Sequence, residues 1–311
     1  MAGIGVVVNP HARGNRRYRD RVQRLADIVG EGGIVRETES IVHITDVACE
    51  FLARQVEIVA VCGGDGSVFR CLSAFIPVYG NEPLPLLLPL RAGTINFLAA
   101  AIGCRRGAPE KVLAHVARDY VHGGTHDVVE RDVLCVNGTQ YGFVFGCGTV
   151  VNFLRAYYGR HGTGRLSAAI LLAKVVVSAL AGASLARGIV QPVEADILCD
   201  GERVPFRLFT AVLAATVDRI ALGFKPTYLA TRKRGYFHIV GGPIGVGGFL
   251  RSIYRLYRGF PTGERALYDN LARQVSIRFE SAATYMIDGD VLPAVAELQV
   301  TTGPRVAMIR G

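Results

Sequence analysis

The spacing of apolar residues changes between two periods in the first third of the chain. Short continuous apolar runs predict buried strands, and they occupy residues 4–8, 34–35, 56–62 and 84–88. Apolar residues recurring every three or four positions predict helices between and after these strands, near residues 18–29, 46–53, 68–75, 95–102 and 112–116. We expect Thr45 to cap the second helix and Pro109 to lie in the first turn of the last.

Strands that alternate with helices predict a parallel sheet covered by helices on both faces. We therefore expect an α/β domain over residues 1–123, ending near Gly123-Gly124. After this point short β-rich runs, separated by glycine-rich or polar turns, replace the alternation. They predict an antiparallel β domain over residues 124–291, with one helical insertion near 165–186.

Two apolar stretches of the second domain could face either protein or membrane. Residues 166–185 are apolar, but Lys174 in their middle would cost about 2.5–3.5 kcal/mol at a bilayer centre. A helix packed on the domain is favoured, and a membrane-surface helix or a span stays an alternative. The second stretch is aromatic and alternates with arginines. We expect its aromatic side chains to face the core and favour this over a membrane contact; they are Tyr254, Tyr257 and Phe260.

Charge and cysteine content narrow the partners and the compartment. The chain of 311 residues carries a formal net charge of +9, and only four of its 35 basic residues are lysine. Such a balance favours nucleotides, nucleic acid or an anionic membrane surface, but no nucleic-acid-binding module is recognisable. The seven cysteines are scattered without a C-x-x-C pair and predict free thiols in a reducing compartment. We find no signal peptide at the N-terminus.

Three glycine-containing loops follow predicted parallel strands, where open α/β sheets bind their ligands. They are Asn9-Pro10-His11-Ala12-Arg13-Gly14, Gly63-Gly64-Asp65-Gly66-Ser67 and Arg91-Ala92-Gly93-Thr94-Ile95-Asn96. Glycine lets the backbone N–H groups approach an anion, and the helices that follow add favourable dipoles. The three loops together predict a polyphosphate site. Thr38, at the end of the second strand, is a further candidate for contact with the nucleotide.

Other common phosphate and hydrolase motifs are missing from the sequence. No glycine precedes a lysine, so there is no G-x-x-x-x-G-K-[ST] loop. The first strand is not followed by G-x-G-x-x-G, which disfavours a dinucleotide fold of the Rossmann type. H-E-x-x-H and G-x-S-x-G are also absent.

The loops resemble the signatures of the diacylglycerol kinase catalytic-domain family, which belongs with sphingosine kinases and NAD kinases. Gly63–Ser67 resembles its G-G-D-G-T motif, and Asn9-Pro10 its opening N-P-x-x-G loop. Gly93-Thr94-Ile95-Asn96 resembles its P-x-G-T-x-N segment, and Asp288-Gly289-Asp290 its D-G-E motif. The resemblance implies an α/β nucleotide domain and a β-sandwich-like second domain, with a C-terminal segment, 292–311, that completes the first domain. It also implies ATP with Mg²⁺ and a lipid alcohol as acceptor.

The sequence departs from the family pattern at four places. Ser67 replaces threonine, Phe97 replaces an acidic residue, and Asp290 replaces glutamate. The basic run Arg232-Lys233-Arg234-Gly235 stands near an acidic segment that bacterial relatives use for a structural Mg²⁺. Basic side chains do not ligate a cation, so we expect this second metal site to be absent. The run could instead meet lipid phosphate or form a solvated turn.

The resemblance assigns roles to three carboxylates. Asp290 is the first choice for the base that deprotonates the acceptor hydroxyl, and Asp65 is the second. Asp288 would orient Asp290, and either Asp65 or Asp288 could help to hold Mg²⁺, which would otherwise be held through the ATP phosphates. From the residues alone, Asp288-Gly289-Asp290 would be an ordinary turn.

The sequence therefore predicts an ATP-dependent lipid kinase that is cytoplasmic and associates peripherally with a membrane. A kinase for a soluble acceptor such as NAD and a non-catalytic nucleotide or lipid sensor remain alternatives. A homo-oligomer is compatible with the sequence, and no nucleic-acid partner is expected.

Overall fold

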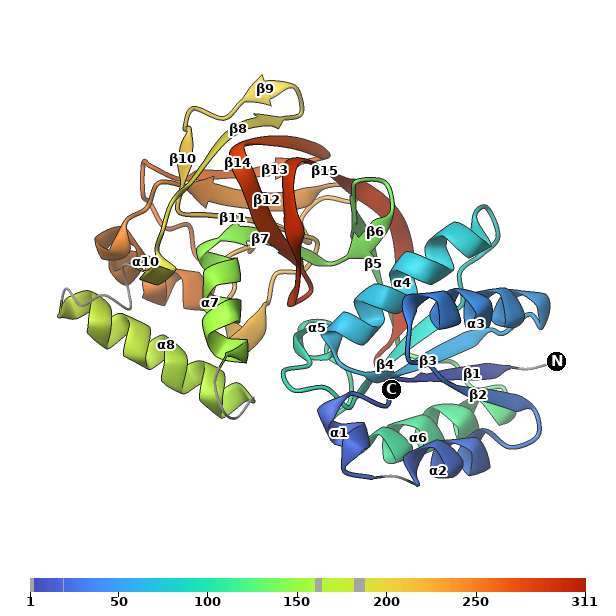
Figure 1. The fold of residues 1–311 in the computed structure, drawn as a ribbon. Helices are drawn as coiled ribbons and strands as arrows, with labels where there is room; N and C mark the ends of the chain where they lie inside the picture. The colour runs from blue at the N-terminus through green and yellow to red at the C-terminus, as the bar shows by residue number, and fades with distance from the viewer. Residues whose placement is uncertain (1–2, 19, 160–163, 182–187) are drawn as a thin grey trace. The chain divides into compact units, whose positions relative to one another are not determined.

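The computed structural model describes residues 3–18, 20–159, 164–181 and 188–311, and the chain forms two compact units (Figure 1). Unit 1 consists of Met1–Arg131, Thr139–Tyr141 and Pro304–Gly311, and unit 2 contains Asp132–Gly138 and Gly142–Gly303. The sequence predicted that the first domain ends near residue 123 and that the chain returns to this domain at residue 292. In the structure the main divisions fall at 131 and 304, within two long strands, β5 (Val128–Val136) and β15 (Asp290–Ile309).

Unit 1 contains the predicted parallel sheet. Its strands lie in the order β2-β1-β3-β4-β15, with β1 at Ile4–Val8, β2 at Gly33–Glu37, β3 at Ile58–Gly63 and β4 at Leu86–Arg91. Only the C-terminal end of β15 belongs to this unit, where Met308 pairs with Leu87 in parallel. The apolar strands are buried on both sides, which explains why their sequences do not alternate.

Helices cover both faces of this sheet, as predicted (Figure 1). The helices α3 (Ile41–Ala53) and α4 (Asp65–Tyr79) pack together on one face, and α2 (Arg21–Val29) and α6 (Pro109–Val121) on the other. Pro109 occupies the first turn of α6 as expected. The cap predicted for α3 is wrong: the helix begins earlier, where the Ser40 hydroxyl accepts a hydrogen bond from His43 N–H at 3.2 Å. The Thr45 hydroxyl instead donates to the Ile41 carbonyl within the helix.

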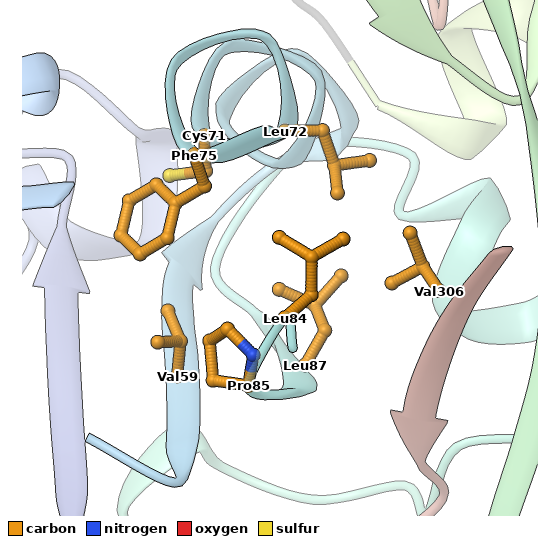
Figure 2. A pocket seen from close by; sticks show the side chains of 8 residues that line it. All are labelled: Val59, Cys71, Leu72, Phe75, Leu84, Pro85, Leu87 and Val306. Carbon is orange, nitrogen blue, oxygen red and sulfur yellow. The ribbon is translucent and has the colours of Figure 1, made fainter. Parts of the chain in front are cut away.

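A small apolar pocket lies between α4 and the sheet of unit 1 (Figure 2). Its lining includes Val59 of β3, Leu72 and Phe75 of α4, and Val306 of β15. Leu84 and Pro85, which precede β4, show that the pocket lies toward the amino end of that strand. It is therefore a gap in core packing, at the end of the sheet opposite the glycine loops.

Unit 2 is rich in antiparallel β-structure, as the sequence predicted. The strands β13 (Tyr268–Ala272), β12 (Phe237–Gly242), β11 (Ala211–Ala215), β7 (Val144–Gly148) and β14 (Gln274–Ile287) lie side by side in this order. The long β14 shifts register between Arg278 and Tyr285. Its first half pairs with β8 (Val193–Cys199), and its last residues pair with β7. The remaining strands are β6 (Gln140–Gly142, in both units), β9 (Glu202–Arg203) and β10 (Leu208–Phe209).

The helical content of unit 2 exceeds the single predicted insertion. The described residues contain α7 (Thr149–Tyr158), α8 (Arg165–Leu180) and α10 (Val246–Arg258), with a 3-10 turn, η1, at Ala221–Gly223. The sequence of α7 is rich in β-branched and aromatic residues, which gives it little helical signature. The α8 insertion was predicted, although residues 182–186 of that prediction lie outside the described residues.

Two expectations about apolar segments have different outcomes. Among the described residues, no helix is long and apolar enough to cross a membrane. The core-facing stripe predicted for Tyr254, Tyr257 and Phe260 is wrong, because their side chains are 65%, 51% and 50% exposed. Glycines and polar residues fill other positions of α10, so the sequence alone does not show which side meets the protein.

All seven cysteines are free, and five of them are buried.

Candidate active site

The three glycine loops of unit 1 follow β1, β3 and β4 and lie in contact at the carboxyl end of the sheet. Asn9 joins the first loop to the second, because its side-chain amide donates to the Ser67 hydroxyl at 2.8 Å. The Gly64 N–H donates to the same hydroxyl at 3.3 Å. Ser67, which replaces the threonine of the family motif, therefore uses its hydroxyl to hold two loops together.

Close backbone contacts join the second loop to the third. Ala92 N–H donates to the Gly63 carbonyl at 3.0 Å, and Gly14 N–H of the first loop donates to the Ala92 carbonyl at 2.9 Å. Gly64 and Gly93 approach so closely that a Cβ atom on Gly93 would lie 2.3 Å from the Gly64 Cα. Glycine is required here by the approach of two backbones, because any side chain would separate the loops.

Asp65 connects the second loop to α5 (Phe97–Ala101). Its carboxylate oxygens accept hydrogen bonds from Phe97 N–H at 3.1 Å and from Leu98 N–H at 3.0 Å. These are N–H groups of the first turn of α5, so Asp65 caps that helix. Burial raises the pKa of Asp65 to about 6, and the backbone hydrogen bonds only partly offset that rise. The Asp65 carboxylate thus holds the second loop and the start of α5 in register.

Asn96 fixes the third loop from within. It adopts the left-handed conformation (φ 52°, ψ 52°), which asparagine tolerates better than most residues. Its side chain accepts from Gly93 N–H and donates to the Gly93 carbonyl, both at 3.0 Å. The family motif led the sequence analysis to this residue, and the structure explains its chemistry: an amide side chain both donates and accepts here.

The remaining nucleotide candidates differ in accessibility. His11 and Arg13 are exposed, and Asn9, Pro10, Gly14, Gly66 and Thr94 are half-buried. Thr38 is buried, and its N–H donates to the Val8 carbonyl at 2.9 Å. The Arg91 guanidinium donates to the carbonyls of Ala99 and Cys104, both at 2.9 Å. Arg91 therefore stabilises the end of α5 in this structure, whereas Arg13 presents its charge at the surface of the first loop.

Asn15 is a residue of this site that the sequence analysis missed. Its buried side-chain amide donates to the carbonyls of Asn9 and Cys62 at 2.7 and 2.9 Å. Its oxygen accepts from Arg21 at 3.0 Å, and Arg21 forms an ion pair with Glu110. Asn15 thus ties the first loop to β3. Its position just after the loop gave no signal, because a polar residue there is equally common on a solvated helix.

The two candidate carboxylates of unit 2 lie close together: Asp288 is in the turn between β14 and β15, and Asp290 begins β15. Asp288 is only 3% exposed and has a positive φ of 49°. Its carboxylate accepts from Val144 N–H at 2.8 Å and from Phe143 N–H at 3.0 Å. Asp288 N–H donates in return to the Val144 carbonyl at 2.9 Å. The structure therefore gives Asp288 an anchoring role, since it fixes the turn that carries Asp290.

Asp290 begins β15 and is half-buried, which leaves it more accessible than Asp288. The turn between the two carboxylates is also held by Tyr158 of α7, whose hydroxyl donates to the Gly289 carbonyl at 3.0 Å. Tyr158 was not found from the sequence, because α7 itself was not predicted. The arrangement suits a carboxylate that is held in place by its neighbours, as a general base must be.

The basic run at 232–235 forms a turn in unit 2. Gly235 N–H donates to the Asp132 carboxylate at 2.8 Å, and the Lys233 ammonium lies 3.7 Å from the centre of the Tyr236 ring. Within the described part of the chain, no three His, Cys, Asp or Glu side chains gather as a metal site.

These features define the class of protein. Three interlocked glycine loops lie at the carboxyl end of an open parallel sheet, and the N-terminus of the 15-residue helix α4 lies behind one of them. This arrangement is suited to bind a phosphorylated nucleotide. Residues 3–126, which contain all three loops, match the family model of the diacylglycerol kinase catalytic domain. This match confirms the resemblance of the three loops, and Asp288-Gly289-Asp290 lies outside the matched residues.

Solved structures show the same fold over almost the whole chain. A diacylglycerol kinase from Bacillus anthracis str. Sterne is 18% identical, with a TM-score of 0.66 over 99% of this chain and 96% of that chain. Two more structures from the same strain have TM-scores of 0.69 and 0.66 at 18% identity, again over 99% of this chain. They cover 96% and 97% of those chains. No curated protein sequence matches the chain.

Proposed function

We propose that the chain is an ATP-dependent lipid kinase that transfers the γ-phosphate of ATP to the hydroxyl of diacylglycerol or a related lipid alcohol at a membrane surface. The observation that carries the proposal is the set of interlocked glycine loops within residues 3–126, the segment that matches a kinase catalytic domain. Phosphoryl transfer requires positioning and neutralisation of charge, and loop amides of this kind supply both.

The loops of unit 1 would hold the triphosphate. Gly64, Gly66 and Gly93 carry no side chains of their own, so phosphates could approach the backbone closely, and the α4 dipole favours an anion beside Gly66. The N–H groups of Gly64 and Gly93 bond to Ser67 and Asn96 and hold the loops in shape. Arg13, exposed on the first loop, would add a positive charge. Asp65 and Asn96 would act by keeping the loops in register, because their polar side-chain atoms bond the backbone of the third loop and of α5.

Asp290 would accept the proton of the acceptor hydroxyl, and Asp288 would position it. A single carboxylate at the end of a well-anchored turn can be held within reach of a hydroxyl, as general-base catalysis requires. Asp288 is less suited to proton transfer, since backbone amides already occupy its oxygens.

Mg²⁺ would neutralise charge on the phosphates when ATP binds. The donors present fit a cation that is held mainly by the nucleotide, because carboxylates are suitable ligands but are not clustered in the described residues. Asp65 is the carboxylate of the glycine loops that could contribute an oxygen, and Asp288 is the alternative.

A panel of acceptors tests the proposed function. The purified chain would be incubated with γ-labelled ATP and Mg²⁺ and with diacylglycerol, a sphingoid base, phosphatidylglycerol or a polyprenol in mixed micelles. NAD would serve as the soluble acceptor. We expect label in one lipid and none in NAD. Label in NAD alone would contradict the lipid proposal, and ATP binding without any labelled product would favour a sensor.

A further inference from the structure

Exposed apolar side chains gather on two helices of unit 2. Among the described residues, six of the fourteen exposed large apolar side chains lie on α8, on α10 or just after α10. On α8 these are Leu166, Ile170 and Val177, which are 75%, 46% and 64% exposed. On α10 and its end they are Tyr254, Tyr257 and Phe260. The two helices pack against each other, so their exposed residues belong to one region of unit 2 (Figure 1).

The exposed apolar residues of α8 form one continuous stripe along its outer face. Leu166, Ile170 and Val177 are four and seven positions apart, the spacing of residues on one face of a helix. The opposite face is packed against the protein, where Ala168, Leu171 and Val175 are at most 5% exposed. The exposed stripe therefore does not contribute to the packing of α8 against the protein. An exposed apolar face of this kind marks an interaction surface.

The exposed charged residues of both helices are basic. Neither α8 nor α10 contains an acidic residue. Lys174 is exposed within the α8 stripe, and Arg251, Arg255 and Arg258 are exposed along α10. Two of these arginines also contact their own domain: Arg251 pairs with Glu264, and Arg255 donates to the Pro261 carbonyl. Apolar and aromatic side chains interleaved with basic ones are typical of helices that lie in a membrane interface.

We infer that the exposed faces of α8 and α10, here called the α8–α10 surface, dock this protein on an anionic lipid bilayer. The aliphatic side chains of α8 enter the boundary between headgroups and acyl chains, and Tyr254 and Tyr257 lie at headgroup level. Lys174 and Arg258 contact lipid phosphates. This inference deepens the proposed function and rests on it, because an acceptor that is dissolved in a bilayer requires the enzyme to come to the membrane.

A second copy of the chain fits this surface less well than a bilayer. A two-fold interface would place the same patch on both sides. Because neither helix carries an acidic residue, Lys174 and Arg258 would then approach other basic residues without an acidic partner. The centres of protein interfaces are also depleted of charge. Nucleic acid would match the basic residues but would leave the α8 aliphatic stripe in water.

Vesicle binding of the full chain without ATP tests the inference. One variant, Leu166→Gln with Val177→Gln, removes apolar contacts. A second, Lys174→Gln with Arg258→Gln, removes charge. The matched control is Val42→Gln with Val121→Gln, which changes two valines of unit 1 that are 73% and 78% exposed on other helices. Circular dichroism would confirm that all variants fold.

The partition of each variant onto vesicles gives a defined pattern. With vesicles of phosphatidylglycerol and phosphatidylcholine in equal parts, we expect the apolar variant to bind about tenfold or more weakly, from the loss of buried aliphatic groups. The charge variant should bind roughly 25-fold more weakly at low salt, about fivefold for each charge. With pure phosphatidylcholine only the apolar variant should differ from the wild type, and the control should match the wild type throughout.

Binding by both variants at wild-type strength would overturn the inference. A dimer that is seen by sedimentation and is lost in the apolar variant, with vesicle binding unchanged, would assign the surface to a second copy. Vesicle binding that follows the pattern, with no lipid labelled in the acceptor panel, would keep the docking surface and reject the kinase proposal. Phosphorylation of a short-chain, water-soluble diacylglycerol should be unchanged in both variants.

Discussion

Asp65 and Asp288 are two carboxylates whose neighbours are mainly backbone N–H groups. The first caps α5 and the second fixes the turn between β14 and β15. Buried carboxylates are tolerated where such donors satisfy them. Both residues therefore act on the geometry of the segments around them, and Asp290, which is half-buried, is the carboxylate that we propose for proton transfer.

Removing the Asp288 carboxylate should destabilise unit 2. Asp288→Ala leaves the N–H groups of Phe143 and Val144 without their acceptor, which costs about 1–3 kcal/mol for each buried group. We expect the free energy of unfolding to fall by roughly 2–5 kcal/mol, measured by urea denaturation. Asp288→Asn keeps one acceptor oxygen, so its free energy of unfolding should lie between those of the wild type and the alanine variant. An alanine variant as stable as the wild type would contradict the anchoring role.

The raised pKa of Asp65 predicts a specific pH dependence. Because folding favours the protonated form, this group binds more protons in the folded chain, so its contribution to stability is lost as pH rises from about 4 to about 6. The cost above pH 6 amounts to about 3 kcal/mol. Asp65→Asn does not titrate, so its free energy of unfolding relative to the wild type should be more favourable at pH 7 than at pH 4.

Urea denaturation of both proteins at the two pH values measures this difference. Asp27→Asn, which changes an exposed carboxylate on α2, is the control and should show the same difference from the wild type at both pH values. The raised pKa would be contradicted if Asp65→Asn behaved in the same way as this control.

At the scale of elements, the proposed nucleotide binding depends on the close contact between the second and third loops. Gly93→Ala places a methyl group against the Gly64 backbone and must separate the second and third loops. We expect ATP affinity to fall about ten- to hundredfold, because small displacements of positioning groups have effects of that size. Isothermal titration calorimetry would measure the affinity.

Gly32→Ala is the matched control for this loop. An added Cβ at Gly32 meets no atom within 4 Å, and Gly32 lies in the exposed turn before β2. Its ATP affinity should equal that of the wild type. Equal affinities for the Gly93 and Gly32 variants would show that the close approach of the loops does not shape the nucleotide site.

The sequence predicted the elements of unit 1 well because two signals agree there: the apolar periodicity, and the glycine, proline and polar residues that separate the elements. Val193–Cys199 of unit 2 was also located by its β-rich composition. The helices α7 and α10 were not assigned, since aromatic, β-branched and glycine residues weaken their helical pattern. Motifs found the glycine loops and the three aspartates. They could not show that Arg91 and Asp65 bond to the α5 segment, because that depends on contacts between distant residues.

At the scale of the whole molecule, two compact units divide the proposed work. The phosphate-binding loops belong to unit 1, and the turn with Asp288 and Asp290 belongs to unit 2. Nucleotide should therefore act first on unit 1. At about 100 times the dissociation constant, ATP would stabilise the state that binds it by roughly 2.7 kcal/mol.

Hydrogen exchange with and without ATP and Mg²⁺ would locate this stabilisation. We expect slower exchange in the loops after β1, β3 and β4 and at the start of α4. The α8–α10 surface should be unaffected by nucleotide and should be protected by anionic vesicles instead. Protection by ATP that is confined to unit 2 would contradict the assignment of the loops.

The proposed reaction is the transfer of the γ-phosphate of ATP to a lipid hydroxyl, with Asp290 as the base that accepts the hydroxyl proton. The most direct measurement is the transfer of label from γ-labelled ATP to diacylglycerol in mixed micelles by the wild type, by Asp290→Asn and by the control Asp196→Asn. Asp196 lies on β8, where it pairs with Arg203. We predict labelled lipid from the wild type and the control, with a rate at least about 100-fold lower for Asp290→Asn. A wild-type protein that binds ATP but labels no lipid, or an Asp290→Asn variant with the wild-type rate, would contradict the claim.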